Sequence, residues 1–238
     1  MESYSELLHV YTITWNEEKI IQDFINWYRN RVPGCKITIW DNMSTDNTID
    51  IALAYNCEVI PFDTGDQMDE QTLIDIRNTC WVDSNAKYCC IVDADEWVAL
   101  NKDMLLKNLD SDEWTICKCE GYEMFGLSSE MNELICGTRS EGYCKPVLFR
   151  KDKITEMNFA PGSHSAEPTG DVKLKLNYPN LYHTKWRTWE NGIKRAHLLA
   201  ERRSEHSKSM GWNVHYQFDD DVHKDYYMNG MRDRIKIR

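Results

Sequence analysis

The fold is decided by the stretch Tyr88-Cys89-Cys90-Ile91-Val92-Asp93-Ala94-Asp95-Glu96. It is a short apolar run that ends abruptly in three carboxylates, which is typical of a buried strand that delivers acidic side chains to one edge of a sheet. In α/β sheets, ligands bind at the carboxyl ends of the strands. Because carboxylate oxygens bind hard divalent cations, and such cations bind phosphates, we expect a cation and a phosphorylated ligand at this edge.

The residues before this stretch alternate between strand and helix patterns, which predicts a parallel sheet with right-handed crossovers. Strands are predicted over residues 7–14, 37–40, 57–62 and 88–92, and helices over residues 49–55 and 70–85. A further helix, capped by Asn16, is predicted to end at Pro33. Thr14, Asp41 and Asp93 each follow a different strand, so they should line one crevice.

The pattern loosens after residue 101. Strands are predicted over residues 114–119 and 144–150, and helical spacing returns over residues 188–207. We therefore predict an α/β fold with a mostly parallel sheet flanked by helices. Residues 1–184 would form the main domain, and residues 185–238 a C-terminal helical extension packed on it.

The chain has 238 residues and a formal net charge of −11. This charge opposes binding to nucleic acid or to anionic membranes. The sequence has neither a run of about 18 apolar residues nor a signal-peptide pattern at its start, so we expect a cytoplasmic protein without membrane insertion. The nine cysteines are predicted to be reduced thiols, and the spacing of Cys117 and Cys119 does not suit zinc.

Several of these motifs occur in an order and spacing that resemble the family-two glycosyltransferases of GT-A fold. They are Asn16-Glu17, Asp41 with residues 44–48, Arg77-Asn78 and Asp93-Ala94-Asp95. The interval of sixteen residues from Arg77 to Asp93 is similar to the family's spacing. A weaker similarity to the family ninety-two group extends through residues 121–126, 145–146 and 162–164.

The resemblance implies a Rossmann-like GT-A fold, with a nucleotide-sugar half over about residues 1–100 and an acceptor half over about residues 101–184. It also implies Mn²⁺ or Mg²⁺ and a nucleoside-diphosphate sugar donor, with a UDP-sugar favoured over a GDP-sugar. Asp95 would ligate the metal directly, and Asp93 would contact the ribose or a metal-bound water. An acidic triplet alone is a weak signal because most acidic residues are simply solvated, so the position of this one at a strand end carries the interpretation; the alternative is a capped strand end with exposed acids.

Further donor contacts follow from the same resemblance. Thr14, Asn16 and Asp41 would lie at the nucleobase or ribose, while Arg77 and Lys145 would contact the phosphates. Three of these residues also have a purely structural interpretation. Asp41 suits a turn, Arg77 an exposed helical salt bridge, and Lys145 a surface position.

GT-A enzymes often complete the metal or diphosphate site with a late histidine. His164 is preferred because Gly162 and Ser163 make its loop compact, so the predicted metal set is Asp93, Asp95 and His164. His183 is the alternative.

An inverting transferase needs a carboxylate to take the proton of the acceptor hydroxyl. Glu123 and Glu167 are the preferred candidates, and Glu120 and Asp171 stay open. Stacking of a sugar is considered for three tryptophans, although aromatic residues more often belong to the core. They are Trp97, Trp186 and Trp189.

We expect a metal-dependent glycosyltransferase that transfers a sugar to a glycan or other hydroxyl acceptor, with inversion implied by the resemblance. One alternative is a sugar-phosphate nucleotidyltransferase, which usually has a glycine-rich loop after the first strand; residues 14–18 contain no glycine. The other is a noncatalytic carbohydrate-binding protein of the same fold.

Overall fold

The predicted strand and helix alternation is present in the computed structural model, which describes residues 6–128, 130 and 133–237. The first half consists of β1 (Leu8–Thr14), α1 (Ile21–Arg31), β2 (Lys36–Asp41), α2 (Thr48–Ala54), β3 (Glu58–Pro61), α3 (Glu70–Thr79) and β4 (Tyr88–Ile91). Strands β1 to β4 are paired in parallel, with β1 between β2 and β4. These strands confirm the expected parallel half of the sheet.

The middle of the chain adds β5 (Glu96–Val98), α4 (Lys102–Ser111), β6 (Ile116–Met124), β7 (Cys136–Arg139), η2 (Glu141–Tyr143), β8 (Leu148–Arg150), β9 (Ile154–Glu156), η3 (Pro161–Ser163), β10 (Thr169–Gly170) and β11 (Leu174–His183). The C-terminal part contains α5 (Trp189–Arg202), α6 (Glu205–Ser209), η4 (Val214–Gln217), α7 (Asp220–Asp233) and β12 (Ile235–Lys236).

The main sheet has the order β12-β7-β6-β8-β4-β1-β2-β3, and β11 pairs with β5 and β6. Strand β8 is antiparallel to both β4 and β6, whereas β11 runs parallel to β6. The register places His183 of β11 opposite Glu123 of β6. The carboxyl ends of β1, β6 and β11, and the residues that follow β4, therefore share one edge of the sheet.

Burial explains why these segments form strands and helices. Four apolar side chains of α1 recur at helical spacing and are fully buried against the sheet: Ile21, Phe24, Ile25 and Tyr28. In β1, Leu8 and Val10 are fully buried, as expected for a central strand covered on both faces.

Two predicted helix boundaries were wrong. Asn16 does not cap α1; its backbone is left-handed (φ 53°), and its side-chain Oδ1 accepts hydrogen bonds from the backbone N–H of Thr45 (2.8 Å) and Asp46 (3.3 Å). Helix α3 ends at Thr79 rather than near residue 85. Directly after it, Trp81 turns into the core and packs edge-on against Phe149, with 4.8 Å between the ring centroids.

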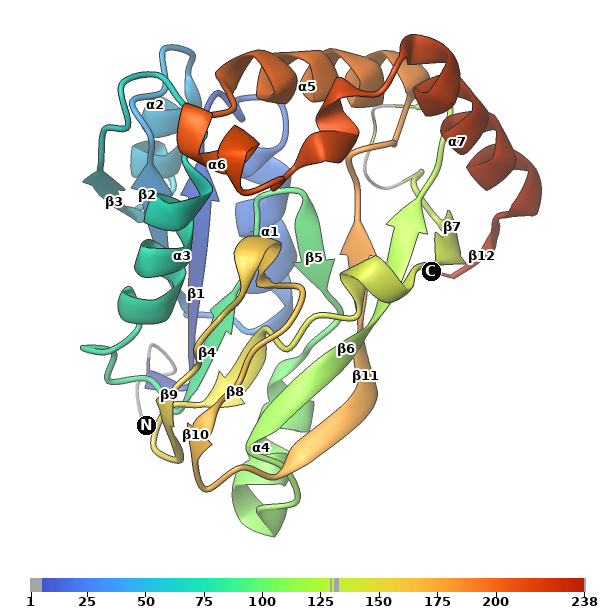
Figure 1. Ribbon diagram of the computed structural model, residues 1–238. Helices are drawn as coiled ribbons and strands as arrows, with labels where there is room; N and C mark the ends of the chain where they lie inside the picture. The colour runs from blue at the N-terminus through green and yellow to red at the C-terminus, as the bar shows by residue number, and fades with distance from the viewer. Residues whose placement is uncertain (1–5, 129, 131–132, 238) are drawn as a thin grey trace.

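The C-terminal segment lies across the edge of the sheet where the strands end. Figure 1 shows α5 and α6 above the carboxyl ends of β1 and β2, with α4 at the opposite end of the molecule. The backbone N–H of Met68 donates to the carbonyl of Arg202 at 2.5 Å, and Ser204 N–H donates to the carbonyl of Met68 at 3.2 Å. This pairing fixes the end of α5 to the loop before α3.

All nine cysteines are free thiols, and seven of them are buried. Among the described residues, no helix is long and apolar enough to cross a membrane.

Candidate functional site

A cavity of about 490 Å³ lies between the carboxyl ends of the strands and the C-terminal segment. Its floor contains residues from β1, α3, the turn after β4, β6 and β11, and its roof comes from residues 185–226. Nine of the site residues considered from the sequence line it: Thr14, Arg77, Asp93, Asp95, Glu123, Lys145, His164, His183 and Trp186. The topology therefore brings together groups that are far apart along the chain.

Asp93 is held by two cationic side chains. Its Oδ1 accepts a hydrogen bond from Arg77 Nη2 at 3.0 Å, and its Oδ2 lies 4.0 Å from Lys145 Nζ. Arg77 also donates to Glu70 Oε1 at 3.0 Å, and Lys145 forms an ion pair with Glu96. Arg77 and Lys145 are both buried, so neither the exposed helical salt bridge nor the surface lysine describes them.

These charges set the protonation of Asp93. Burial alone raises the pKa of a carboxyl group, but Arg77 and Lys145 outweigh burial and leave the pKa of Asp93 below its usual value. Asp93 is therefore an anion at neutral pH.

A second chain of contacts starts at Asp95. Asp95 Oδ2 lies 3.3 Å from Nε2 of His183, and Nδ1 of His183 lies 2.6 Å from Glu123 Oε1. The other oxygen of Glu123, Oε2, accepts a hydrogen bond from the hydroxyl of Tyr226 at 3.0 Å. The His183 ring is stacked on Tyr143, with 3.9 Å between the centroids.

The two carboxylates control the charge of His183. Burial alone lowers the pKa of an imidazole, but Glu123 and Asp95 raise the pKa of His183 to about 10. The pKa of Asp95 is held below its usual value because the effect of His183 exceeds that of burial. In the absence of another cation, the imidazolium of His183 thus bridges two carboxylates.

His164 lines the same cavity but has different contacts. Its Nδ1 lies 2.5 Å from the carbonyl oxygen of Gly142; the residue is exposed on one side, and desolvation by the atoms packed around its ring, with the Lys145 charge, lowers the pKa of the ring. No polar contact joins His164 to Asp93 or Asp95 among the contacts of the described residues. Of the two histidines considered from the sequence, His183 is the one that contacts Asp95.

Two of the predicted donor-binding residues do not line the cavity. Asp41 is fully buried and accepts hydrogen bonds from the hydroxyl of Thr14 (2.9 Å) and from the backbone N–H of Ser44 (2.7 Å). Asn16 connects the end of β1 to the loop after β2. Both residues hold the cavity wall in place, whereas Thr14 and the neighbouring Trp15 line the cavity.

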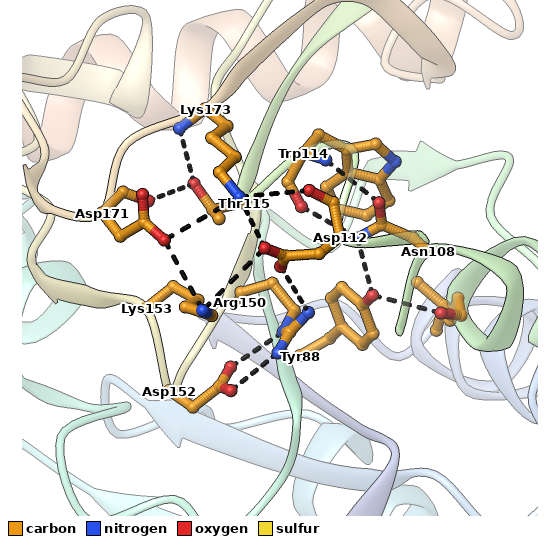
Figure 2. A network of polar contacts seen from close by, with 11 residues as sticks. Tyr88, Asn108, Asp112, Trp114, Thr115, Arg150, Asp152, Lys153, Asp171 and Lys173 are labelled. Carbon is orange, nitrogen blue, oxygen red and sulfur yellow. Dashed lines mark hydrogen bonds and ion pairs between the residues drawn. The ribbon is translucent and has the colours of Figure 1, made fainter. Parts of the chain in front are cut away.

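Three of the four carboxylates considered as proton acceptors lie elsewhere. Glu167 is exposed, and Glu120 is paired with Arg139 at 3.1 Å. Asp171 belongs to a network with Lys153 (3.5 Å) near the start of β4, at the opposite end of the sheet (Figure 2). None of the three lines the cavity.

The three tryptophans are mostly structural. Trp97 is buried in the core against Trp27, at 5.1 Å between centroids. Trp186 is also buried, stacks with Trp189 at 6.0 Å, and presents part of its ring to the cavity.

Sequence reasoning missed several cationic residues of the roof. Lys185 is buried beside Tyr216, with Nζ 4.4 Å from the ring centroid, and burial lowers its pKa to about 8. Arg195 and Arg202 lie on the same face of α5 and also line the cavity. Arg202 lies over the ring of Trp15 at 3.5 Å, and burial lowers its pKa to about 10.

Glu17 was missed as a cavity residue as well. It forms an ion pair with Arg195, and burial raises its pKa to about 7. The helical spacing of Arg195, Leu199 and Arg202 was the available signal for the roof, but charged residues of an amphipathic helix usually face solvent.

The described residues do not form a metal site with three or more protein ligands. Within residues 6–128, 130 and 133–237, no three His, Cys, Asp or Glu side chains are grouped so that they could hold a metal ion. Any ion in this cavity would need ligands from a bound molecule or from water in addition to the protein.

No family model and no curated protein matches this chain. Its fold is similar to solved structures of TarS from S. aureus. For the full TarS chain the TM-score is 0.49 at 15% identity, covering 82% of this chain and 39% of TarS. TarS 1–349 in complex with UDP-GlcNAc gives a TM-score of 0.45 at 16% identity, covering 82% of this chain and 66% of that one.

A third similar structure is the mannosyltransferase PcManGT from Pyrobaculum calidifontis, in complex with GDP-Man and Mn²⁺. Its TM-score is 0.43 at 13% identity, covering 82% of this chain and 62% of PcManGT. The likeness is limited to the overall fold. At such values no donor, acceptor or site residue transfers from these proteins to this chain.

Proposed function

We propose that this chain is a metal-dependent glycosyltransferase that transfers a sugar from a nucleoside-diphosphate sugar to a hydroxyl acceptor. The observation that carries the proposal is the charge pattern of the cavity. In a chain of net charge −11, one cavity is lined by five cationic side chains and by six carboxylates, among them Asp93 and Asp95. The five are Arg77, Lys145, Lys185, Arg195 and Arg202.

This combination suits a diphosphate with a divalent cation. The cationic side chains favour a polyanion, whereas the carboxylates favour a cation, and a metal-bound diphosphate presents both charges. The volume of about 490 Å³ is in the range of small-molecule sites.

The side chains present also fit a metal. Ligands at right angles around an octahedral ion are separated by about 3 Å when each bond is about 2.1 Å. The 3.3 Å between Asp95 Oδ2 and His183 Nε2 is close to that value. Mn²⁺ and Mg²⁺ are often bound by one or two protein groups, with substrate phosphates and water as the other ligands, which agrees with the lack of a three-residue cluster.

We assign Asp95 and His183 as the metal ligands, with His183 in the place first given to His164. When bound, the ion would supply Lewis-acid stabilisation of the charge that develops on the leaving diphosphate. Arg77 and Lys145 hold Asp93 ionised and oriented toward the cavity.

Glu123 is a positioning residue in this proposal. Both of its oxygens accept hydrogen bonds, one from His183 and one from Tyr226, so it orients the imidazole instead of removing a proton from the acceptor. We also propose, from the sequence resemblance, that the transfer inverts the configuration at the sugar and that the donor is a UDP-sugar in preference to a GDP-sugar.

A thermal-shift panel tests the proposal. UDP-, GDP- and dTDP-sugars are each added with and without Mn²⁺ to the wild-type protein and to Asp95→Asn. One donor should stabilise the wild type in a metal-dependent way, by about 2.7 kcal/mol at about 100 times its Kd. Asp95→Asn should lose the metal dependence while it stays folded. If no nucleotide sugar shifts the wild type, the proposal is wrong.

A further inference from the structure

The roof of the cavity has a second part, which we call the α7 wall. It consists of His215, Tyr216, Phe218, Val222, His223 and Tyr226, all of which line the cavity. These residues come from η4, from Phe218 directly after it, and from the first two turns of α7. Aromatic and aliphatic groups dominate the α7 wall, in contrast to the cationic face of α5.

Three large hydrophobic side chains of the α7 wall are exposed. Phe218 is 48% exposed, Val222 51% and Tyr226 45%. Val222 and Tyr226 are four residues apart on one face at the start of α7, and Phe218 lies just before its N-cap residue, Asp219. Apolar side chains that line a cavity and stay exposed to water provide a surface that gains stability when a ligand covers it.

His223 supplies a polar group in the same wall. It is only 5% exposed, and its Nε2 has no hydrogen-bond partner among the described residues. The ring lies between Trp186 and Phe218, at 5.8 and 6.3 Å between centroids. A buried polar atom without a partner costs about 1–3 kcal/mol, so a ligand hydroxyl that bonds to Nε2 would recover that cost.

The α7 wall adjoins the proposed reaction centre. The hydroxyl of Tyr226 donates to Glu123, and Glu123 in turn contacts His183. The molecule bound against this wall is thus next to the Asp95 and His183 pair, where an acceptor must lie.

We propose that the α7 wall binds the acceptor, and that the acceptor is an uncharged carbohydrate. The C–H face of its ring would pack on Phe218, Val222 and Tyr226, and one hydroxyl would bond to His223 Nε2. This inference rests on the proposed function and moves acceptor binding from residues 101–184 to the C-terminal extension.

Charge and chemistry favour this ligand over others. A sugar ring combines an apolar face with hydroxyl groups, which matches apolar side chains beside a single unpartnered nitrogen. The exposed acidic residues 219–221 and Asp225 border the outer side of the α7 wall and oppose an anionic acceptor there, whereas the cation of Lys185 lies deeper, 4.4 Å from the Tyr216 ring.

Saturation-transfer NMR with methyl glycosides of glucose, galactose, mannose and N-acetylglucosamine tests this binding directly. Spectra are recorded without nucleotide and with UDP or GDP plus Mn²⁺. At least one glycoside should bind to the wild type, and Phe218→Ala and Val222→Ala should each weaken that binding at least tenfold. Met228→Ala is the matched control, because Met228 is also on α7 and 56% exposed but does not line the cavity.

His223→Leu provides a second readout. It removes the unpartnered Nε2 together with the hydrogen bond between the ring and the Tyr216 backbone, and these two losses oppose each other in stability, so the melting temperature should change little while glycoside binding falls at least tenfold. A merely structural histidine would give lower stability and unchanged binding.

The outcomes separate the two proposals. Normal glycoside binding in both Phe218→Ala and Val222→Ala, or no glycoside binding to a wild type that does bind nucleotide sugar, overturns the α7 wall as the acceptor site. Glycoside binding that depends on the α7 wall, in a protein that binds no nucleotide sugar, upholds the site and rejects the transferase.

Discussion

Glu123→Gln tests whether the carboxylate behind His183 positions a metal ligand or removes a proton. Glu123 is buried and contacts Nδ1 of His183 at 2.6 Å and the hydroxyl of Tyr226 at 3.0 Å. Glutamine keeps the shape of the side chain but removes the charge that holds the imidazole. Loss of such an outer partner typically lowers metal affinity 10- to 100-fold, which is about 1.4–2.7 kcal/mol.

The assay is donor turnover as a function of Mn²⁺ concentration. For Glu123→Gln we expect the Mn²⁺ concentration at half-maximal rate to rise 10- to 100-fold, while kcat at saturating Mn²⁺ stays within about tenfold of the wild type. Removal of a general base would instead lower kcat by about 10²–10⁴. Glu120→Gln is the control, because Glu120 is on the same strand but outside the cavity.

A fall of kcat by a hundredfold or more at saturating metal, with unchanged Mn²⁺ dependence, would refute the positioning role. Glu123 would then be the proton acceptor considered from the sequence.

Three further predictions concern stability. Arg77→Met should lower the free energy of unfolding by about 3–5 kcal/mol in urea titrations at pH 7, because it leaves two carboxylates without their buried partner; a loss below 1 kcal/mol would contradict this pairing. Burial lowers the pKa of His9 to about 4. Between pH 6.5 and pH 4 the unfolded chain therefore binds a proton at this residue that the folded chain does not bind. About 3 kcal/mol of folding stability should be lost as the pH falls through this range. His9→Gln should remove that part of the pH dependence, and identical pH profiles would disprove it. Gly192→Ala should lower the melting temperature, because the added Cβ would lie 1.9 Å from the Trp186 ring. Such overpacking costs about 1–3 kcal/mol, which exceeds the gain in helix propensity from glycine to alanine. An unchanged melting temperature would contradict this packing of Gly192 against Trp186.

The sequence predicted the parts of the fold that local patterns determine. The run that ends in Asp93 and Asp95 is a buried strand followed by a turn into the cavity, because an apolar run bounded by acids has few other stable placements. Helix α3 was predicted six residues too long, since the turn of Trp81 into the core depends on Phe149, a partner 68 residues away that no local pattern reveals.

The candidate site was predicted less completely, for a related reason. Whether His164 or His183 meets Asp95 depends on the register between β6 and β11, which places His183 opposite Glu123. The local sequence favoured His164, in a compact loop, and carried no information on that register.

The residues of the cavity roof could not be predicted from the sequence for a different reason. Arg195 and Arg202 are ordinary charged positions of an amphipathic helix, and only the packing of α5 over Trp15 turns them toward the cavity. For Asp41 the predicted position at a strand end was correct, but the predicted contact with the donor was not supported. Its carboxylate instead accepts hydrogen bonds from Ser44 in the turn that follows.

The most direct measurement of the central claim is anomalous diffraction at the manganese edge from crystals grown with Mn²⁺ and UDP. We predict one strong manganese peak within coordination distance of Asp95 and His183, with the UDP phosphates in the same cavity facing Arg195 and Arg202. The peak should be absent from Asp95→Asn crystals. A manganese ion that contacts neither Asp95 nor His183, or UDP bound outside the cavity, would contradict the account.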